Sequence, residues 1–467
     1  MSSPAKLDLG SAPLTSLMIR LSLPSITAYL INILYNVVDR IYIGHIPGGS
    51  SLALTGVGVC FPVITLISAF SAFAGGGGAP LAAIELGKTE WDDAAHKRAQ
   101  AILANAFLMM LIFAVALTIF FMITKKAVLR SFGASDQTLP YADAYLSVYL
   151  CGTLAVELSI GLNPFITAQG KAKTAMLSVL IGAVLNIALD PLFIFAFGWG
   201  VRGAAWATII SQAASALWIL AFLTSARSVL RLSVGMLRLS LRVCAKIASL
   251  GISPFIMQAT ESAIFVVFNS GLQKYGGDIC VAAMTIMQSL MQLCHYPLQG
   301  FTMGIQPIIS YNFGAKNIPR VKATIRRSCL VCFVFSLAAF VLTRAFPAFF
   351  VGFFTTDEQL RELAARTLPV YFGAMWIFGI QMSAQSTFVA LGKAKTSLFI
   401  ALLRKVILLI PLALILPIFT GVSGIFAAEP IASTISALTA GAFLLVCYKR
   451  IRAIEADERV RLCQAGE

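Results

Sequence analysis

Six carboxylates lie inside segments that are otherwise apolar, where an acidic side chain is least expected. They are Asp39, Glu85, Glu157, Asp190, Glu261 and Glu429. On membrane-insertion scales an ionisable side chain in the middle of such a segment costs about 2.5–3.5 kcal/mol, so these residues indicate function by default. Glu85 is the exception, because it lies near the end of its segment and can reach water by snorkelling.

Two of the acids share a helical face with other polar groups. Asn32, Tyr35 and Asp39 are spaced i, i+3 and i+7 along the first apolar segment, and Asn186 and Asp190 are spaced i, i+4 in a later one. Two carboxylates that meet in apolar surroundings favour the protonated form, which is the chemistry of a proton carrier. The same oxygens could instead coordinate Na⁺, so the coupling ion could be either H⁺ or Na⁺.

Each of these acids also has a purely structural interpretation. Asp39 could pair with the neighbouring Arg40 at the membrane interface, and Asp190 could be a helix-end residue before Pro191. Glu261 could be a second coupling or substrate-binding carboxylate, or a hydrogen-bonded structural glutamate. Glu157 and Glu429 fit a structural role more readily than a functional one.

The elements that carry these residues are long apolar segments. Of 467 residues 58% are hydrophobic and only 12% charged, with mean hydropathy +0.86, whereas a soluble domain has about a quarter of its residues charged. Since one crossing of a bilayer takes roughly 20 apolar residues, the chain is predicted to be an all-α integral membrane protein of about 12 transmembrane helices. The expected spans are 21–42, 53–85, 99–123, 141–167, 174–198, 201–224, 247–272, 280–312, 326–350, 364–390, 396–418 and 422–448.

The basic residues are distributed unevenly between the loops. If the N-terminus is cytoplasmic, 24 of the 35 Lys and Arg lie inside and 9 outside, while Arg404 and Lys405 fall within a span. This asymmetry predicts a multi-pass protein of the inner (plasma) membrane with both termini cytoplasmic. It also explains the net charge of +15 without nucleic acid as a partner.

The chain repeats itself. The sequence GKAKT occurs at 170–174 and again at 392–396, and other matching motifs keep an offset of about 221–230 residues. We therefore expect two six-helix lobes related by a pseudo-twofold axis along the membrane normal, which suits alternating access. The predicted boundaries are 1–225 for the N-terminal lobe, 226–246 for a basic cytoplasmic linker, 247–450 for the C-terminal lobe and 451–467 for a cytoplasmic tail.

No motif for catalysis or nucleotide binding is found. The glycines at 75–78 lack the Lys-Ser/Thr of a phosphate-binding loop, and Cys329 and Cys332 lie in an apolar run where small apolar filler is the better interpretation. We therefore predict that the chain is not an enzyme and has no cofactor. An ion gradient, with H⁺ or Na⁺ as the coupling ion, is the expected energy source.

The chain resembles the multidrug and toxic compound extrusion (MATE) transporters over nearly its whole length. The resemblance is carried by the repeated GKAKT, by the run 37–44 that contains Asp39, and by the run 186–191 that contains Asp190. Within the family the chain looks most like the bacterial DinF-like and MepA-like kind. The resemblance implies an antiporter that exports lipophilic, often cationic, drugs and other xenobiotics in exchange for H⁺ or Na⁺.

The resemblance implies that each residue of the family's N-lobe ion site has a counterpart at the matching position of this chain. The resemblance implies a bending proline at Pro24 and a coupling carboxylate in the seventh helix near Glu261, but the tenth span lacks the acid that accompanies that glutamate in NorM-like relatives. The implied N-lobe ion-site residues are Asn32, Tyr35, Asp39, Asn163, Asn186, Asp190 and Thr208.

The predicted partners are small organic substrates, the coupling ion and membrane lipids, with the chain acting as a monomer. We expect an apolar substrate cleft, lined in part by Asn32, Met284, Met287, Gln288 and Met291. The alternative is a lipid-linked precursor flippase or a metabolite exporter of the same superfamily, for which Arg404 and Lys405 are the residues to watch. A channel and an intramembrane enzyme fit the duplicated halves and the missing motifs less well.

The charge asymmetry predicts which face of the membrane the linker occupies. In an Arg231→Cys variant without the native cysteines, a membrane-impermeant maleimide should label position 231 from the cytoplasmic side only. Labelling from the outside of intact cells would contradict the predicted orientation.

Overall fold

The chain folds into long helices joined by short connections. The computed structural model describes residues 9–46, 50–354 and 357–465, and these residues contain ten helices long and apolar enough to cross a membrane. Two further pairs of shorter helices each pass the same test together, which gives up to 12 crossings. The predicted all-α membrane fold is thereby confirmed.

The first half of the chain forms the N-lobe. Its helices follow the predicted apolar spans, because only a segment that satisfies its own backbone hydrogen bonds is stable in lipid. They are α1 (Leu14–Gly44), α2 (Ser50–Lys88), α3 (Ala95–Ser131), α4 (Leu139–Cys151), α5 (Thr153–Ala168), α6 (Ala172–Pro191), the π-helical η1 (Leu192–Ala196) and α7 (Gly200–Thr224).

The second half forms the C-lobe. It follows a short 3-10 turn, η2 (Val234–Met236), in the linker. Its first element, α8 (Leu241–Gly314), is two spans merged across a break at Gly277, where φ is 69°. The others are α9 (Ile318–Ala345), α10 (Pro347–Gly352), α11 (Glu358–Tyr371), α12 (Met375–Ala390), α13 (Ala394–Leu402), the π-helical η3 (Leu403–Leu409), α14 (Ile410–Thr420) and α15 (Val422–Ala465).

The predicted fourth and tenth spans, 141–167 and 364–390, are bent rather than straight. The axes of α4 and α5 differ by 60° and those of α11 and α12 by 53°. Glycine lies at both bends: a Cβ on Gly152 would lie 2.4 Å from Ile209, and one on Gly373 would lie 2.9 Å from the carbonyl oxygen of Val370. The two bends occupy equivalent places in the two halves, so the repeat extends to this irregular feature.

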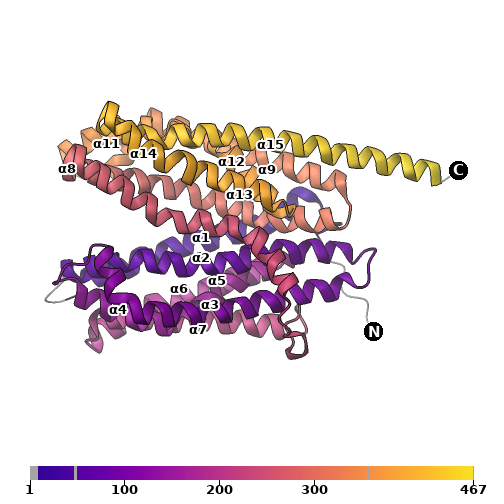
Figure 1. The fold of residues 1–467 in the computed structure, drawn as a ribbon, viewed down its shortest axis with the longest axis horizontal. Coiled ribbons are helices and arrows are strands. Elements are labelled where there is room, and N and C mark those ends of the chain that lie inside the picture. The colour runs from indigo at the N-terminus through magenta and orange to yellow at the C-terminus, as the bar shows by residue number, and fades with distance from the viewer. Residues whose placement is uncertain (1–8, 47–49, 355–356, 466–467) are drawn as a thin grey trace.

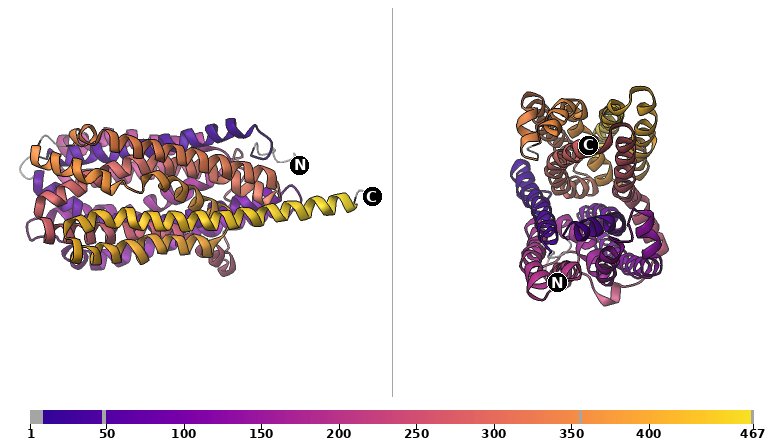
Figure 2. Two further views of the ribbon diagram at one scale, coloured as in Figure 1. Left: turned by 90° about the horizontal axis from the view of Figure 1, so that it is seen from above. Right: turned by 90° about the vertical axis from the view of Figure 1, so that its left-hand side faces the viewer.

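The C-terminal segment is helical beyond the predicted last span. Instead of ending with its membrane span, α15 continues as one helix to Ala465. Figure 1 shows it projecting beyond the other helices at the end of the molecule where the N-terminus also lies. The second view agrees that both ends of the chain lie at one end of the bundle, as an even number of crossings requires (Figure 2).

The two lobes meet mainly along α1, α2 and α8. On the end that carries the termini, glycines let the backbones touch. A Cβ on Gly251 of α8 would lie 1.9 Å from the carbonyl oxygen of Phe73, and one on Gly314 would lie 1.9 Å from that of Ile84. Because no other residue fits so close to a facing backbone, small residues at this crossing fix the lobes together here.

Polar contacts reinforce the same end of the interface. The Asn312 side chain donates to the carbonyl oxygen of Leu9 at 2.9 Å, and Arg320 Nε donates to that oxygen at 3.0 Å. The Trp91 indole donates to the carbonyl oxygen of Gly314 at 3.1 Å. The lobes are therefore held together at the terminus-bearing end by backbone packing and by hydrogen bonds.

The glycine contacts predict that one added methyl group destabilises the protein at Gly251 but not at Gly58. Gly251→Ala should lower stability by about 1–3 kcal/mol, since α2 and α8 must separate to admit the Cβ. The matched control is Gly58→Ala in α2, where nothing lies within 4 Å of the added carbon and helix propensity should rise. Thermal unfolding in detergent measures both; a Gly251→Ala midpoint equal to that of Gly58→Ala would contradict the packing account.

Candidate functional site

The two aspartates singled out in the sequence come together in the N-lobe. Asp39 lies near the end of α1 and Asp190 near the end of α6, two helices that pack side by side. Their charges are within repulsive range of each other. Asp190 is fully buried, so this pair places acidic groups in an apolar environment.

Several oxygens of this pair have no hydrogen-bond donor. Asn186 Nδ2 donates to Asp190 Oδ1 at 3.3 Å. Asp190 Oδ2, Asp39 Oδ1 and Asn186 Oδ1 are buried and without a partner. Buried acceptors normally have a hydrogen-bond partner. These three oxygens, on two neighbouring helices, could instead bind a proton or a small hard cation.

The neighbouring arginine makes a different contact from the one considered in the sequence. The Arg40 guanidinium lies over the Phe61 ring at 4.4 Å from its centroid, while it still exerts a long-range attraction on Asp39. A cation–π contact of this kind holds Arg40 against α2. Among the described contacts Arg40 therefore forms no ion pair with Asp39, and Asp39 Oδ1 is buried without a hydrogen-bond partner.

Tyrosines from two helices border the pair. Tyr35 of α1 feels the charge of Asp39 and contacts Gln212 of α7, and Tyr145 of α4 feels the same charge and contacts Thr208. Sequence reasoning identified Tyr35 and Thr208 but missed Tyr145 and Gln212. The one available signal was the i, i+4 spacing of two tyrosines at 145 and 149, whose rings stack at 6.1 Å.

Two of the expected site residues are engaged elsewhere. Asn163 donates to the carbonyl oxygen of Ala175 at 2.9 Å and to Ser178 Oγ at 2.8 Å. These partners lie 12 or more residues before Asp190 on α6, which is roughly 18 Å along a helix. Asn32 is exposed and accepts a hydrogen bond from Asn36 at 2.8 Å.

The predicted hinge lies beside a fixed point of α1. Pro24 is inside the helix and buried, and it removes one backbone hydrogen bond. On either side of it, Ser22 and Ile26 touch the C-lobe, because Cβ atoms on Gly304 and Gly300 would each come within 2.6 Å of them. The stretch of α1 from Ser22 to Ile26, with the proline inside it, is thus clamped, and the part that carries Asp39 lies beyond the clamp.

Two further N-lobe glutamates have contrasting surroundings. Glu157 is fully buried beside Ser71, and neither carboxylate oxygen has a hydrogen-bond partner. Glu85 instead contacts Lys88 at 2.6 Å and Arg98 at 2.7 Å and is only 15% exposed, so two bases near the helix end neutralise it, whereas snorkelling into water was expected. Arg98 also donates to Asp92 in the adjoining loop and holds the pKa of that carboxyl below its usual value.

The C-lobe acids are paired with bases. Arg404 Nη2 donates to Glu429 Oε1 at 2.9 Å, with side chains only 11% and 7% exposed. Lys405 forms an ion pair with Glu261 and also donates to the carbonyl oxygen of Met257 at 2.7 Å. Both basic residues stand in the π-helical segment η3, an irregularity that often accompanies function.

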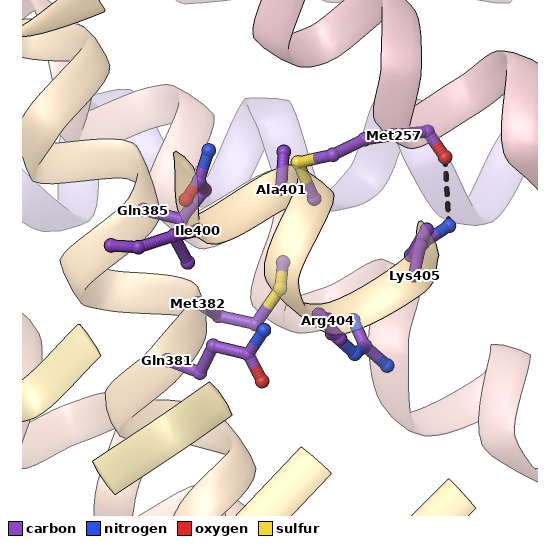
Figure 3. A pocket seen from close by; sticks show the side chains of 8 residues that line it. All are labelled: Met257, Gln381, Met382, Gln385, Ile400, Ala401, Arg404 and Lys405. Carbon is purple, nitrogen blue, oxygen red and sulfur yellow. Dashed lines mark hydrogen bonds between the residues drawn. The ribbon is translucent and has the colours of Figure 1, made fainter. Parts of the chain in front are cut away.

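A small cavity adjoins these ion pairs. It measures about 10 Å³, which is room for roughly one water molecule, and Figure 3 shows Arg404, Lys405, Gln381 and Gln385 around it. Arg404 Nε and the side-chain oxygens of both glutamines are buried without a partner. A bound water would satisfy these groups.

The methionines expected in a substrate cleft lie in two different environments. Met284 and Met287 are fully buried in the C-lobe core, so this arrangement does not bring them to an open surface. Gln288 and Met291 are half-buried, and Met291 borders a second small cavity with Glu429. Hydrophobic spacing alone could not separate the core face of this helix from its other faces.

The two lobes therefore differ in how they neutralise buried acid. Each described C-lobe acid named above has a basic partner of its own, whereas the N-lobe pair of Asp39 and Asp190 has amides, tyrosines and empty acceptor positions. Within the described ranges no cluster of three His, Cys, Asp or Glu side chains could hold a metal ion. The N-lobe arrangement is suited to reversible binding of one positive charge.

Comparison with known proteins identifies the architecture. The multidrug export protein MepA of Staphylococcus aureus is 26% identical over 437 residues, which is 94% of each chain. A crystal structure of a MATE transporter in the bent conformation superposes with TM-score 0.89 at 23% identity, covering 97% of this chain and 100% of that one. An outward-facing multidrug resistance MATE transporter of the MOP superfamily gives 0.88 at 22%, covering 97% and 99%.

The family profile matches both lobes. It covers residues 24–192 and 254–415, one match in each half of the duplicated chain. Both matched ranges include residues discussed above, from Pro24 and Asp39 in the first to Glu261 and Lys405 in the second. The chain belongs to the MatE family, the multidrug and toxic compound extrusion transporters, which are membrane transporters and not enzymes.

Proposed function

We propose that the chain is a secondary active antiporter that exports lipophilic, often cationic, organic compounds in exchange for H⁺ or Na⁺. The carrying observation is the difference between the lobes: among the described residues Asp39 and Asp190 form no ion pair and leave buried oxygens without a partner, whereas Glu261 and Glu429 are each paired with a base. The unpaired site needs a cation from outside the protein, and a gradient of that cation can supply energy.

The coupling unit consists of Asp39 and Asp190 with the groups that orient them. Asn186 donates to Asp190 directly, while Tyr35 and Thr208 belong to the shell around Asp39. Asn163 acts at a distance by fixing α5 against α6. Glu261, considered for coupling on the sequence, is left out of this unit because Lys405 already supplies its positive charge.

The movement follows from the clamp on α1. Binding of H⁺ or Na⁺ removes the repulsion between the two aspartates, so the outer part of α1 can approach α6. Gly300 and Gly304 hold α1 on both sides of Pro24, at Ile26 and Ser22, and the hydrogen bond missing at the proline makes α1 easiest to bend within this contact. Bending there changes the space between the lobes and releases the substrate outward.

Closure at the terminus-bearing end supports alternating access. With the termini cytoplasmic, the contacts of Gly251, Gly314 and Trp91 close the cytoplasmic side, which corresponds to an outward-facing state of a single chain in the inner membrane. The inward-facing state requires these contacts to break. Opening this end also separates a buried apolar cluster that both lobes share, which includes Leu86 of the N-lobe and Ile308 of the C-lobe.

The flippase alternative is less well supported. A cleft for a pyrophosphate needs accessible basic groups, but Arg404 and Lys405 are 11% and 5% exposed and each is neutralised by a glutamate. The described C-lobe therefore offers little net positive charge to a lipid pyrophosphate. Apolar and aromatic surfaces, with the few acids described, suit bulky lipophilic cations better.

The proposed coupling unit predicts what happens when one of its carboxyl groups is replaced by an amide, which has the same shape but cannot bind or release a proton. In everted vesicles, Asp39→Asn and Asp190→Asn should each reduce transport driven by an imposed pH or Na⁺ gradient to background, while binding of a fluorescent cation persists. Asp136→Asn is the control, because that carboxylate is 94% exposed in a loop pair with Arg130. Transport at the normal rate by either N-lobe variant would remove that residue from the coupling unit.

The substrate class predicts a resistance phenotype. Cells that express the protein should tolerate higher concentrations of ethidium and of quaternary ammonium compounds than cells that express Asp39→Asn at the same level. Growth inhibition across a dilution series measures this. Equal inhibition of both strains, with the protein present in the membrane, would remove support for drug export and favour a lipid or metabolite substrate.

A further inference from the structure

A short segment before α1, residues 9–13, lies at the terminus-bearing end of the bundle and is not part of a helix. Its residue Leu9 is only 1% exposed. The Leu9 side chain belongs to the buried apolar cluster that contains Leu86 of the N-lobe and Ile308 of the C-lobe. Leu9 therefore fills a position at the junction of the two lobes.

The backbone of this segment is held by the C-lobe. Arg320 of α9 donates from Nε to the Leu9 carbonyl oxygen at 3.0 Å and from Nη2 to the Ala12 carbonyl oxygen at 2.5 Å. The Leu9 oxygen also accepts a hydrogen bond from Asn312 Nδ2 of α8 at 2.9 Å. Hydrogen bonds from a charged donor are stronger than neutral ones, so the guanidinium fastens the segment at two points.

The side chain of Leu9 contacts the N-lobe. A Cβ on Gly170, in the first GKAKT turn, would lie 3.4 Å from Leu9 Cδ2. At the second copy of the turn, a Cβ on Gly392 would lie 3.5 Å from Cδ1 of Ile84 in α2. The two equivalent turns are thus covered differently, one by a residue of a membrane helix and the other by a residue outside any helix.

The lobes cannot part at this end while Leu9 keeps both of its contacts. Thr15, at the start of α1, accepts a hydrogen bond from Arg327 of α9 at 2.8 Å, so the beginning of α1 is tied to the same helix of the C-lobe. Opening therefore either draws Leu9 away from Gly170 or breaks the hydrogen bonds to Arg320. The first route exposes an apolar side chain and the second loses charged hydrogen bonds, so each disfavours the open state.

We propose that residues 9–13 form a latch that holds the cytoplasmic end of the lobes closed, with Arg320 as its anchor on the C-lobe and Gly170 as its contact on the N-lobe. The inference rests on the alternating access of the proposed function and adds the segment that sets the balance between the two states. The latch stabilises the outward-facing state and opens before the cytoplasmic side becomes accessible. It lies about 40 Å along α1 from Asp39, so it acts without touching the proposed ion site.

The latch is tested with cysteine reporters in a full-length protein without the native cysteines. Ile308→Cys reports on the cytoplasmic side, because Ile308 is buried in the cluster that the lobes share. In everted vesicles a membrane-impermeant maleimide should label this reporter at least about fivefold faster when it is combined with Leu9→Ala or with Arg320→Met. The matched control is Arg326→Met, which removes an exposed arginine of the same helix and should leave the rate unchanged.

A second reporter distinguishes a latch from a loosened fold. Asn32 is exposed on α1, one turn beyond Tyr29, whose ring stacks on Tyr296 of the C-lobe at 6.2 Å. Labelling of Asn32→Cys from outside, in right-side-out vesicles, should not rise in the latch variants, because they deplete the outward-facing state.

Three outcomes contradict the expectation. A faster rate at both reporters, or an Ile308→Cys rate that stays unchanged in either latch variant, overturns the latch and leaves the proposed function intact. Rapid labelling of Ile308→Cys while the latch is intact contradicts closure of the cytoplasmic end, and with it both the latch and the proposed alternating access.

Discussion

The free-energy cost of holding a charge away from water determines how the two lobes differ. In the C-lobe the cost is offset within the chain, because Lys405 and Arg404 stand beside Glu261 and Glu429. In the N-lobe Asp39 and Asp190 repel each other, with acceptor oxygens unfilled. A duplicated fold thus has one half in which both buried glutamates are paired with bases, and one half whose aspartates, on the proposed function, take up an ion.

In the proposed mechanism, the contacts between the lobes convert ion binding into movement. Gly251 and Gly314 bring backbones of the two lobes into contact at the terminus-bearing end, and α1 is clamped to the same surface around Pro24. Occupation of the aspartate pair acts on the part of α1 beyond the proline. In the proposed mechanism a local change of charge therefore alters the space between the lobes.

The fold could be predicted from the sequence because lipid imposes one rule on every span, and the repeated GKAKT revealed the duplication. Asp39 and Asp190 were accessible to the same reasoning, since each shares a helical face with an amide. The pairing of Glu261 with Lys405 was not, because 144 residues separate them and nothing local links them. The bends at Gly152 and near Gly373 and the buried positions of Met284 and Met287 likewise depend on packing between helices, which apolar spacing does not encode.

The central claim is that the exchangeable cation belongs to the N-lobe aspartates. The most direct measurement is the number of H⁺ or ²²Na⁺ ions displaced when saturating tetraphenylphosphonium is added to the purified protein. The account predicts that wild type and the Lys405→Met/Glu261→Gln variant displace the ion equally, whereas Asp39→Asn displaces none. Displacement that persists in Asp39→Asn and disappears in the Lys405→Met/Glu261→Gln variant would contradict it.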